Sequence, residues 1–325
     1  MWHFGKFYTM EESNKTGMTY FIIEGISDVP ELQLPIFLLV LLIYLFILGG
    51  NMTIFLLICM DRHLHTPMYF FLANLSILDV SCSTITLHKP LITFLTGNKL
   101  VSFVGCVMQM FFFLSFTCNE LLILTAMGYD RYVAICHPLH YQVIMSHKVC
   151  CGLAGVCWVL GFLDIMPCAW KVSSISCYTS LEVNHFFCDF VPIMKLSCSD
   201  TFALQLYVII EGVILASFVP FVLTFISYVF IIKSILRIRS SNGRWKAFYT
   251  CSSHLTIIVL LYGTLSYQYF RPVEYITLGS YKLSSLFNTT CVPILNPLIY
   301  SLKNKDVHSA LKRKFKKMSR LIKRK

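Results

Sequence analysis

Charged side chains are scarce in this sequence. They make up 13% of its 325 residues, against 56% for apolar side chains, whereas a water-soluble domain of ordinary composition carries about 25%. The chain therefore has too little polar surface to enclose a soluble globule, and its mean hydropathy of +0.68 agrees with that. A lipid bilayer is the solvent that such a composition fits.

Three other absences narrow the class of protein further. Residues 1–20 hold no continuous apolar stretch of the kind found in a cleavable signal peptide, so the first long apolar segment is expected to act as an uncleaved anchor. No HExxH or GxSxG motif is present, and we expect neither an enzyme nor an organic cofactor. Neither inverted repeats nor matching broken helices are visible, which disfavours a transporter or channel.

Seven long apolar stretches are present instead. A helix needs roughly 20 mainly apolar residues to cross the hydrocarbon core, and within that core a helix satisfies its own backbone polar groups. The chain is therefore predicted to be an all-α membrane protein, a seven-transmembrane helix bundle over residues 35–302 between an N-terminal segment (1–34) and a basic tail (303–325). The predicted spans cover approximately residues 35–60, 67–88, 103–128, 149–168, 202–232, 248–270 and 281–302.

The basic residues indicate the orientation in the membrane. Residues 233–247 include five Lys and Arg residues and no acid, and the tail from residue 303 holds eleven against one acid, Asp306. Because Lys and Arg favour the cytoplasmic side, we expect an extracellular N-terminus and a cytoplasmic C-terminus in the plasma membrane. This distribution accounts for the net charge of +11 without a nucleic-acid partner.

Two local patterns agree with that orientation. The sequon at Asn14 lies on the predicted outer side, where N-glycosylation takes place, while three other sequons fall inside predicted spans and should stay unmodified. In the tail, Val307, Leu311 and Phe315 recur four residues apart, as in a short amphipathic eighth helix lying on the cytoplasmic membrane surface. A frayed basic tail is the alternative.

Four segments carry a resemblance to a known family. They are LHTPMYFFL at 64–72, MGYDRYVAIC at 127–136, KAFYTCSSHL at 246–255 and PILNPLIYSL at 293–302. Together they resemble olfactory receptors, a branch of the rhodopsin-like (class A) G-protein-coupled receptors, over about residues 20–315. The resemblance implies a receptor that binds small, mostly apolar odorants and activates a stimulatory heterotrimeric G protein, raising cAMP. The alternative is a non-olfactory rhodopsin-like receptor for a small amine or another metabolite.

The sequence departs from the family pattern at two positions. Gly128 stands where the family usually has Ala, and Tyr249 stands where it usually has Ser. Glycine inside a helix costs up to about 1 kcal/mol relative to alanine, so Gly128 is expected to loosen the third helix. Tyr262 and Gly263 occupy the region where other rhodopsin-like receptors carry a Trp, which is the olfactory pattern.

The resemblance also implies a G-protein switch at the inner end of the third span. It consists of Asp130, Arg131 and Tyr132, with Arg131 held by Asp130 at rest. On activation, Arg131 would be released toward Tyr228 and Tyr300 as the sixth helix swings outward. In an arbitrary membrane protein, an arginine at this depth would merely extend its guanidinium to the membrane surface.

Most of the fourteen cysteines lie in apolar stretches, where a thiol is a small buried hydrophobe. Cys106, at the predicted outer end of the third span, lies in an oxidising space. The resemblance implies a disulfide between Cys106 and Cys188, which would fasten the long 168–201 connection over the bundle. It also implies a second disulfide, Cys177–Cys198, for which Cys168 could compete with Cys177.

Two carboxyl groups lie at membrane depth, Asp79 in the second span and Glu120 in the third. Such a pair is stable when a proton or a cation separates the negative charges. The resemblance implies a sodium site formed with Asn296, and a protonated, hydrogen-bonded structural pair is the alternative. Asn51 is expected to support helix packing.

The odorant pocket is expected in the outer half of the bundle, where helical spacing groups residues on facing sides of the spans. Apolar walls with a few hydroxyl groups suit a small, sparingly soluble molecule, although plain helix packing is the alternative for each position. The expected lining residues are Phe113, Leu114, Thr117, Cys118, Gly212, Val213, Ala216, Tyr262, Leu265, Ser266, Tyr269, Leu286 and Thr289.

Two more acids, Asp164 and Glu211, lie in the fourth and fifth spans at heights that would let them approach each other. They either favour a cationic ligand such as an amine or share a proton without touching a ligand. An amine receptor of the other rhodopsin-like branches would carry an acid on the ligand face of the third helix. Phe113 occupies that position here.

Overall fold

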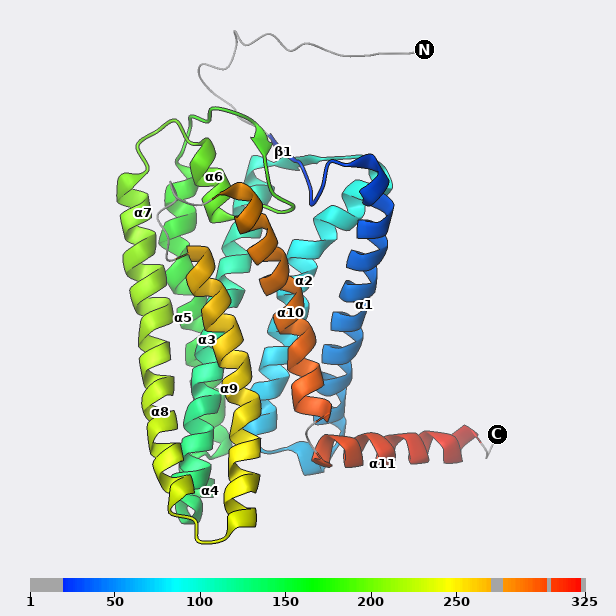
Figure 1. Ribbon diagram of the computed structural model, residues 1–325, viewed down its shortest axis with the longest axis vertical. Helices are drawn as coiled ribbons and strands as arrows, with labels where there is room; N and C mark the ends of the chain where they lie inside the picture. The colour runs from blue at the N-terminus through cyan, green and yellow to red at the C-terminus, as the bar shows by residue number, and fades with distance from the viewer. Residues whose placement is uncertain (1–19, 270–276, 303–304, 323–325) are drawn as a thin grey trace.

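The computed structural model describes residues 20–269, 277–302 and 305–322, and it is almost entirely helical. Its long helices run side by side as one bundle, with α11 lying across one end (Figure 1). The seven rods of the bundle are α1 (Pro30–Met60), α2 (Pro67–Thr96), α3 (Phe103–Cys136), α5 (His147–Ser173), the continuous series α7 (Phe202–Val208), η3 (Ile209–Phe218) and α8 (Val219–Leu236), α9 (Ser241–Tyr269) and α10 (Leu278–Leu302).

The helices coincide with the seven predicted spans, but most are longer. Helix α2 continues to Thr96, where Gly97 ends it in the left-handed conformation at φ 70°. Helix α3 continues through Cys136, and α9 begins at Ser241, seven residues before the expected start. Hydropathy detects the part of a helix that lies in the hydrocarbon core. It does not detect the polar helical turns that extend beyond that core.

Six of the rods are long and apolar enough to cross a membrane by length and composition, among the residues that the structure describes. Helix α10 is the seventh rod, and it packs against α1, α2 and α9 inside the bundle. It buries the polar side chains of Asn288, Thr289, Thr290 and Asn296 inside the bundle. The chain is thus a seven-helix membrane bundle, as predicted.

Helix α3 is the central element of the bundle, because it contacts α2, α5, α8 and α9. Seventeen of its 34 residues are buried, and they lie on several of its faces. Its approach to α5 is close at Gly161, where an added Cβ would lie 2.5 Å from the Asn119 amide nitrogen. At Gly128 there is room instead, since a Cβ would meet Thr224 and His254 at 3.6 and 3.7 Å.

One end of the bundle, which we call the loop end, is covered by the connection between α5 and α7. A three-stranded sheet in the order β2-β1-β3 lies there, formed by β1 (Tyr20–Ile23), β2 (Leu100–Ser102) and β3 (Glu182–Val183). Strand β1 is antiparallel to β2 and parallel to β3. The short helix α6 (Phe190–Leu196) follows in the same connection.

Two disulfides fasten this connection. Cys106 at the start of α3 is bonded to Cys188, and Cys177 is bonded to Cys198, with Cα–Cα distances of 5.3 and 5.4 Å. Both bridges are those that the family resemblance implied. Cys168, the possible competitor of Cys177, is a buried free thiol near the end of α5.

The opposite end, which we call the α11 end, carries a helix rather than a frayed tail. Helix α11 (Lys305–Ile322) buries Val307 and Ala310 against the bundle. Arg313 donates from Nε and Nη2 to the Asp61 carboxylate at 3.0 and 2.8 Å. Burial raises the pKa of Asp61, but the hydrogen bonds from Arg313 and His63 and the charge of Arg313 lower it by more, so it lies below the usual value.

Candidate functional site

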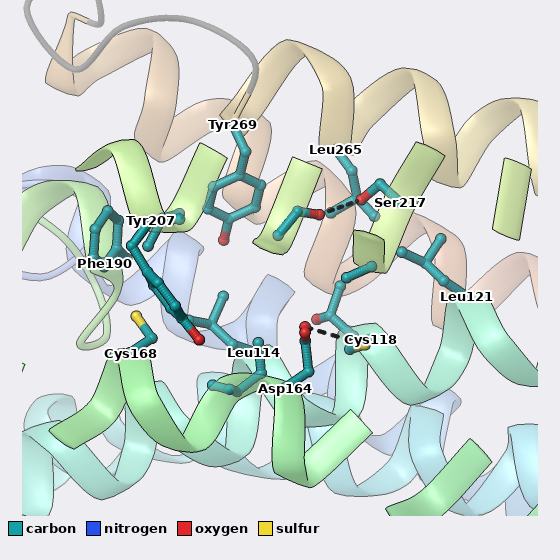
Figure 2. Close-up of a pocket in the computed structure, with 15 residues that line it drawn as sticks. Leu114, Cys118, Leu121, Asp164, Cys168, Phe190, Tyr207, Ser217, Leu265 and Tyr269 are labelled. Atoms are coloured by element: carbon teal, nitrogen blue, oxygen red, sulfur yellow. Dashed lines mark hydrogen bonds between the residues drawn. The ribbon is translucent and has the colours of Figure 1, made fainter. Parts of the chain in front are cut away.

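A cavity lies between α3, α5, the α7–η3 segment and α9, and Phe190 of the covering connection closes it on one side (Figure 2). It leaves about 80 Å³ for the centres of water-sized molecules. Its walls come from four long elements, so a molecule bound there would contact all of them. The residues that line it are Leu114, Thr117, Cys118, Leu121, Asp164, Ile165, Cys168, Phe190, Tyr207, Val208, Gly212, Ala216, Ser217, Leu265 and Tyr269.

The cavity wall is mostly carbon with a few polar groups. Figure 2 shows Asp164 directed from α5 toward Cys118 of α3, whose thiol lies 4.0 Å from a carboxylate oxygen. The Ser217 hydroxyl donates to the carbonyl of Gly212, five residues earlier, at 3.0 Å. This spacing agrees with the π-helical geometry of η3, in which each turn is wider than in an α-helix. Within the part of the lining that the structure describes, Asp164 is the one carboxylate and there is no Lys, Arg or His.

Tyr269 connects the cavity to a buried hydrogen-bond network at the loop end. The Asp189 carboxylate, which caps α6, accepts from the hydroxyl of Tyr281 at 2.5 Å and from that of Tyr269 at 3.3 Å. Gln268 donates to the same carboxylate at 3.4 Å and to the Ser285 hydroxyl at 2.9 Å. One carboxylate therefore joins the covering connection to α9 and α10.

Burial determines the protonation of this network. Burial raises the pKa of Asp189 to about 6, although the hydrogen bonds that it accepts oppose the rise. Burial and the charge of Lys282 lower the pKa of the neighbouring His185 to about 3, although its contact with the Phe187 backbone opposes the fall. The histidine ring is therefore neutral at pH 7 and stacks on Phe186, with ring centroids 4.6 Å apart.

The structure brings together seven of the thirteen residues predicted to line the pocket. Phe113 instead packs on Phe187 at a centroid distance of 4.8 Å, and Tyr262 packs on Phe221 at 5.3 Å. These two side chains do not line the cavity because α3 and α9 are buried on more than one face, and helical spacing does not reveal which buried face borders a cavity. The predicted residues that line it are Leu114, Thr117, Cys118, Gly212, Ala216, Leu265 and Tyr269, and Ser266, Leu286 and Thr289 do not.

Several lining residues escaped the sequence analysis. Tyr207 and Val208 precede Gly212 by one turn of the same rod, so extending the spacing toward the N-terminus would have found them. Phe190 comes from the covering connection, and no periodicity points to it. Asp164 stood out as an intramembrane acid, but its place in the cavity became clear only from the structure.

The predicted switch lies at the α11 end, and one of its expected contacts differs. The Asp130 carboxylate accepts a hydrogen bond from Tyr141 at 2.8 Å, and the one ion pair among the described residues is elsewhere, at the α11 contact. Asp130 and Arg131 therefore form no salt bridge among the described residues, although the charge of Arg131 still acts on Asp130. Arg131 instead directs Nη2 to the Met68 sulfur at 2.6 Å. Tyr132 contacts His137 at 3.1 Å.

Tyr228, the expected partner of Arg131, contacts another residue in this structure. Its hydroxyl shares a hydrogen bond of 2.8 Å with Nδ1 of His254, and it also donates to the Cys251 carbonyl at 3.3 Å. The two rings stack with centroids 5.9 Å apart. These contacts join α8 to α9 at the α11 end and leave Tyr228 engaged away from Arg131.

The predicted sodium ligands do meet in the middle of the bundle. The Asn296 amide nitrogen donates to both oxygens of Asp79 at 3.0 and 2.9 Å. Glu120 is buried and interacts electrostatically with Asp79. Glu120 Oε1 and Asn296 Oδ1 are buried without a hydrogen-bond partner among the described residues. Unpaired oxygen atoms of this kind suit a small hard cation, so the residues present fit the implied ion.

Four predicted or highlighted positions lie outside what the structure describes. Asn14 is outside the described residues, and the side chains of Glu211, Val213 and Tyr300 are outside the described side chains. The glycosylation of Asn14, the approach of Glu211 to Asp164 and the part of Tyr300 in the switch therefore stay predictions.

Comparison with known proteins covers the bundle and α11. A sequence profile of the family described as Olfactory receptor matches residues 40–318. The chain is 45% identical over 308 residues to Olfactory receptor 8G50 of Mus musculus, covering 95% of this chain and 98% of that one. It is 44% identical over 306 residues to Olfactory receptor 8I2 of Homo sapiens, with 94% and 97% covered. It is 46% identical over 301 residues to Olfactory receptor 8B8 of Mus musculus, with 92% and 96% covered.

Proposed function

The chain belongs to the olfactory receptor family, and we propose that its odorant binds in the cavity between α3, α5, α7–η3 and α9. Membership of this family makes it a multi-pass plasma-membrane odorant receptor, coupled to a G protein with cAMP as the signal, and not an enzyme. The choice of a stimulatory, olfactory-type G protein is part of the proposal.

One observation carries the proposal for the site: the cavity touches both the central helix α3 and the end of α9. Leu265 and Tyr269 contribute the α9 wall, and Tyr269 also donates to Asp189. A ligand changes a conformational equilibrium only by binding one state better than the other. A molecule that contacts α9 at the loop end can bind two positions of α9 with different affinity. It can therefore favour the state in which α9 has moved at the α11 end.

At the α11 end we propose that the Tyr228–His254 contact breaks on activation. Outward movement of α9 would carry His254 away from α8 and free the Tyr228 hydroxyl. Arg131 could then exchange its Met68 contact for Tyr228, and Tyr300 would join it. The resulting gap between α3, α8 and α9 would accept the C-terminal helix of a G-protein α subunit.

The orientation belongs to the proposal as well. Strand β1 near the start of the described chain lies at the loop end, whereas α11 lies at the opposite end (Figure 1). The two disulfides at the loop end suit an oxidising outer space. The basic residues of α11 suit the anionic cytoplasmic leaflet. We therefore place the loop end and Asn14 outside the cell.

A sodium ion at Asp79, Glu120 and Asn296 is proposed on the fit of their oxygen atoms. The ion would supply positive charge between two carboxylates that otherwise repel each other. Asn296 holds the Asp79 carboxylate by two hydrogen bonds and keeps its own amide oxygen unpaired among the described residues. Asn51 donates to the Pro293 carbonyl at 3.0 Å, which supports its packing role between α1 and α10.

The test is a cAMP reporter screen of chemically diverse odorants in cells that express the full chain. We expect at least one small odorant to raise cAMP, and Arg131→Ala to abolish the response at equal surface level. A Thr117→Val or Leu265→Phe change in the cavity should shift the half-maximal concentration of that odorant. Responses that persist without Arg131, or that ignore both cavity changes, would contradict the proposal.

A further inference from the structure

We propose that the cavity selects small protonated amines, with the Asp164 carboxylate as the group that recognises the ammonium. This inference deepens the proposed function and rests on it, since it concerns the same cavity. Its starting point is the placement of an acid in a wall whose other described side chains present carbon, sulfur and hydroxyl groups.

The backbone around Asp164 is positioned by a close helix contact. Gly161, one turn earlier on α5, lies so near Asn119 of α3 that a Cβ atom there would meet its side chain at 2.5 to 2.7 Å. This contact fixes the height of α5 against α3. As a consequence the Asp164 carboxylate lies opposite Cys118 and faces the cavity instead of the lipid (Figure 2).

The charge balance of the lining favours a cation. Of the lining residues whose side chains the structure describes, Asp164 is the one carboxylate and none is Lys, Arg or His. Moving an ammonium from water into an apolar cavity is costly unless an opposite charge and hydrogen bonds compensate. A carboxylate in the wall provides an opposite charge and hydrogen bonds for an ammonium group. It offers an alcohol a hydrogen bond only, and it repels a carboxylate ligand.

The remaining walls fit the rest of such a molecule. Phe190, Tyr207 and Tyr269 present aromatic rings, whose faces attract ammonium groups as well as alkyl groups. The Tyr207 ring already receives one cation, since Lys171 Nζ lies 4.5 Å from its centroid. Lys171 is not one of the lining residues, and it follows Asp164 by seven residues, about 10 Å along the helix.

The size of the cavity limits the ligand. The cavity leaves about 80 Å³ for the centres of water-sized molecules, which is room for several waters or for one small organic molecule. A monoamine with a compact branched or cyclic carbon skeleton of similar size fits this space. The second ammonium of a diamine would find no second carboxylate among the described lining residues.

The experiment uses two pairs of probes that differ in charge but little in shape: cyclohexylamine with cyclohexanol, and isopentylamine with isopentyl alcohol. They are applied to the full receptor, tagged for surface detection, with a cAMP reporter. We expect the wild type to respond to each amine at a concentration at least about tenfold lower than to its alcohol. Asp164→Asn should remove most of that difference, and Asp164→Glu should restore it in part.

Asp200→Asn is the matched control. Asp200 is an exposed carboxylate outside the cavity that accepts from the Phe202 amide at 2.9 Å, and we expect its variant to respond as the wild type does. Equal responses of the wild type to amine and alcohol would overturn the inference without any variant. So would an amine preference that survives in Asp164→Asn.

The outcomes also separate this inference from the proposed function. If neutral odorants act through Arg131 while amines of matched shape do not, the receptor function stands and the amine inference fails. If no probe or odorant gives a response that requires Arg131, the proposed function itself fails. Should Asp164→Asn not reach the surface, the comparison of amine with alcohol in the wild type decides.

Discussion

The Asp189 carboxylate accepts a hydrogen bond of 2.5 Å from the hydroxyl of Tyr281, a residue 92 positions later in the chain. Tyr269 donates to the same carboxylate and also lines the cavity. The covering connection, α9 and α10 are therefore linked through one buried acid. Any movement of α9 that follows ligand binding must stretch or rearrange this link.

The first prediction concerns the pH dependence of stability at the loop end. Asp189 has a pKa raised to about 6, so its stabilising contribution is complete below the unfolded value of about 3.9 and is lost as pH rises through 6. His185 has a pKa lowered to about 3, so its contribution is complete above about 6.5 and is lost as pH falls. Between about pH 4 and 6 the two effects oppose each other.

Single variants should separate the two effects. In Asp189→Asn, the melting temperature of the purified receptor in detergent should fall as pH decreases from 6 to 4, because the loss from His185 is no longer offset. In His185→Gln it should rise over the same range. In each variant the slope of the free energy of unfolding against pH approaches about 1.4 kcal/mol per pH unit. Two variants with the same slope as the wild type would exclude this assignment.

A second prediction compares two glycines that face neighbouring helices. Gly161→Ala should destabilise the bundle by about 1–3 kcal/mol, because the methyl group overlaps the buried Asn119 side chain. Gly128→Ala should stabilise it by up to about 1 kcal/mol, because the methyl group meets Thr224 and His254 at ordinary contact distances. Thermal unfolding in detergent measures both. Shifts of the same sign would contradict the packing described.

The third prediction concerns the attachment of α11. Arg313→Ala should loosen this helix, because the guanidinium holds Asp61 by two hydrogen bonds. Hydrogen exchange of the α11 amides should increase in the variant. Lys312→Ala, which removes an exposed neighbouring charge, is the control and should leave the exchange unchanged. Equal exchange in both variants would show that the Arg313–Asp61 contact does not hold the helix.

The sequence predicted the bundle well because lipid imposes a simple rule. Each apolar run of sufficient length is a helix in the structure, and the predictions differ from the structure at the helix ends. Helix α9 begins at Ser241 and α3 runs to Cys136 because polar turns outside the hydrocarbon core still complete their backbone hydrogen bonds. Hydropathy does not measure those turns.

The site was less predictable because it depends on rotation and on a loop. Leu114 and Cys118 were correctly placed in the cavity, whereas Phe113, on the same helix, faces the Phe187 ring. Phe190 enters from a connection whose path depends on the disulfides and on the Asp189 cap. The pairing of Asp130 with Tyr141 likewise depends on a short helix, α4 (Tyr141–Ile144), for which no apolar pattern exists.

The last prediction concerns the contact that joins α8 to α9. His254→Phe keeps a ring of similar size against Tyr228 but removes the ring nitrogen that forms the 2.8 Å hydrogen bond. Because this bond stabilises the arrangement seen here and breaks in the proposed active state, its loss should raise basal cAMP. Tyr228 retains its bond to the Cys251 carbonyl, so the change should be about fivefold at most, the effect of roughly 1 kcal/mol.

Tyr228→Phe removes the same bond but has a different expected outcome. Its basal signal should also rise, yet its maximal response to an odorant should fall, because the hydroxyl that receives Arg131 in the active state is gone. Reporter signals normalised to surface level distinguish the two variants, and Arg131→Ala in either background should silence them. A basal signal in His254→Phe equal to that of the wild type would mean that this bond does not restrain α9. The restraint would then have to come from the hydrogen bond of Tyr228 to the Cys251 carbonyl and from the apolar contacts between α8 and α9.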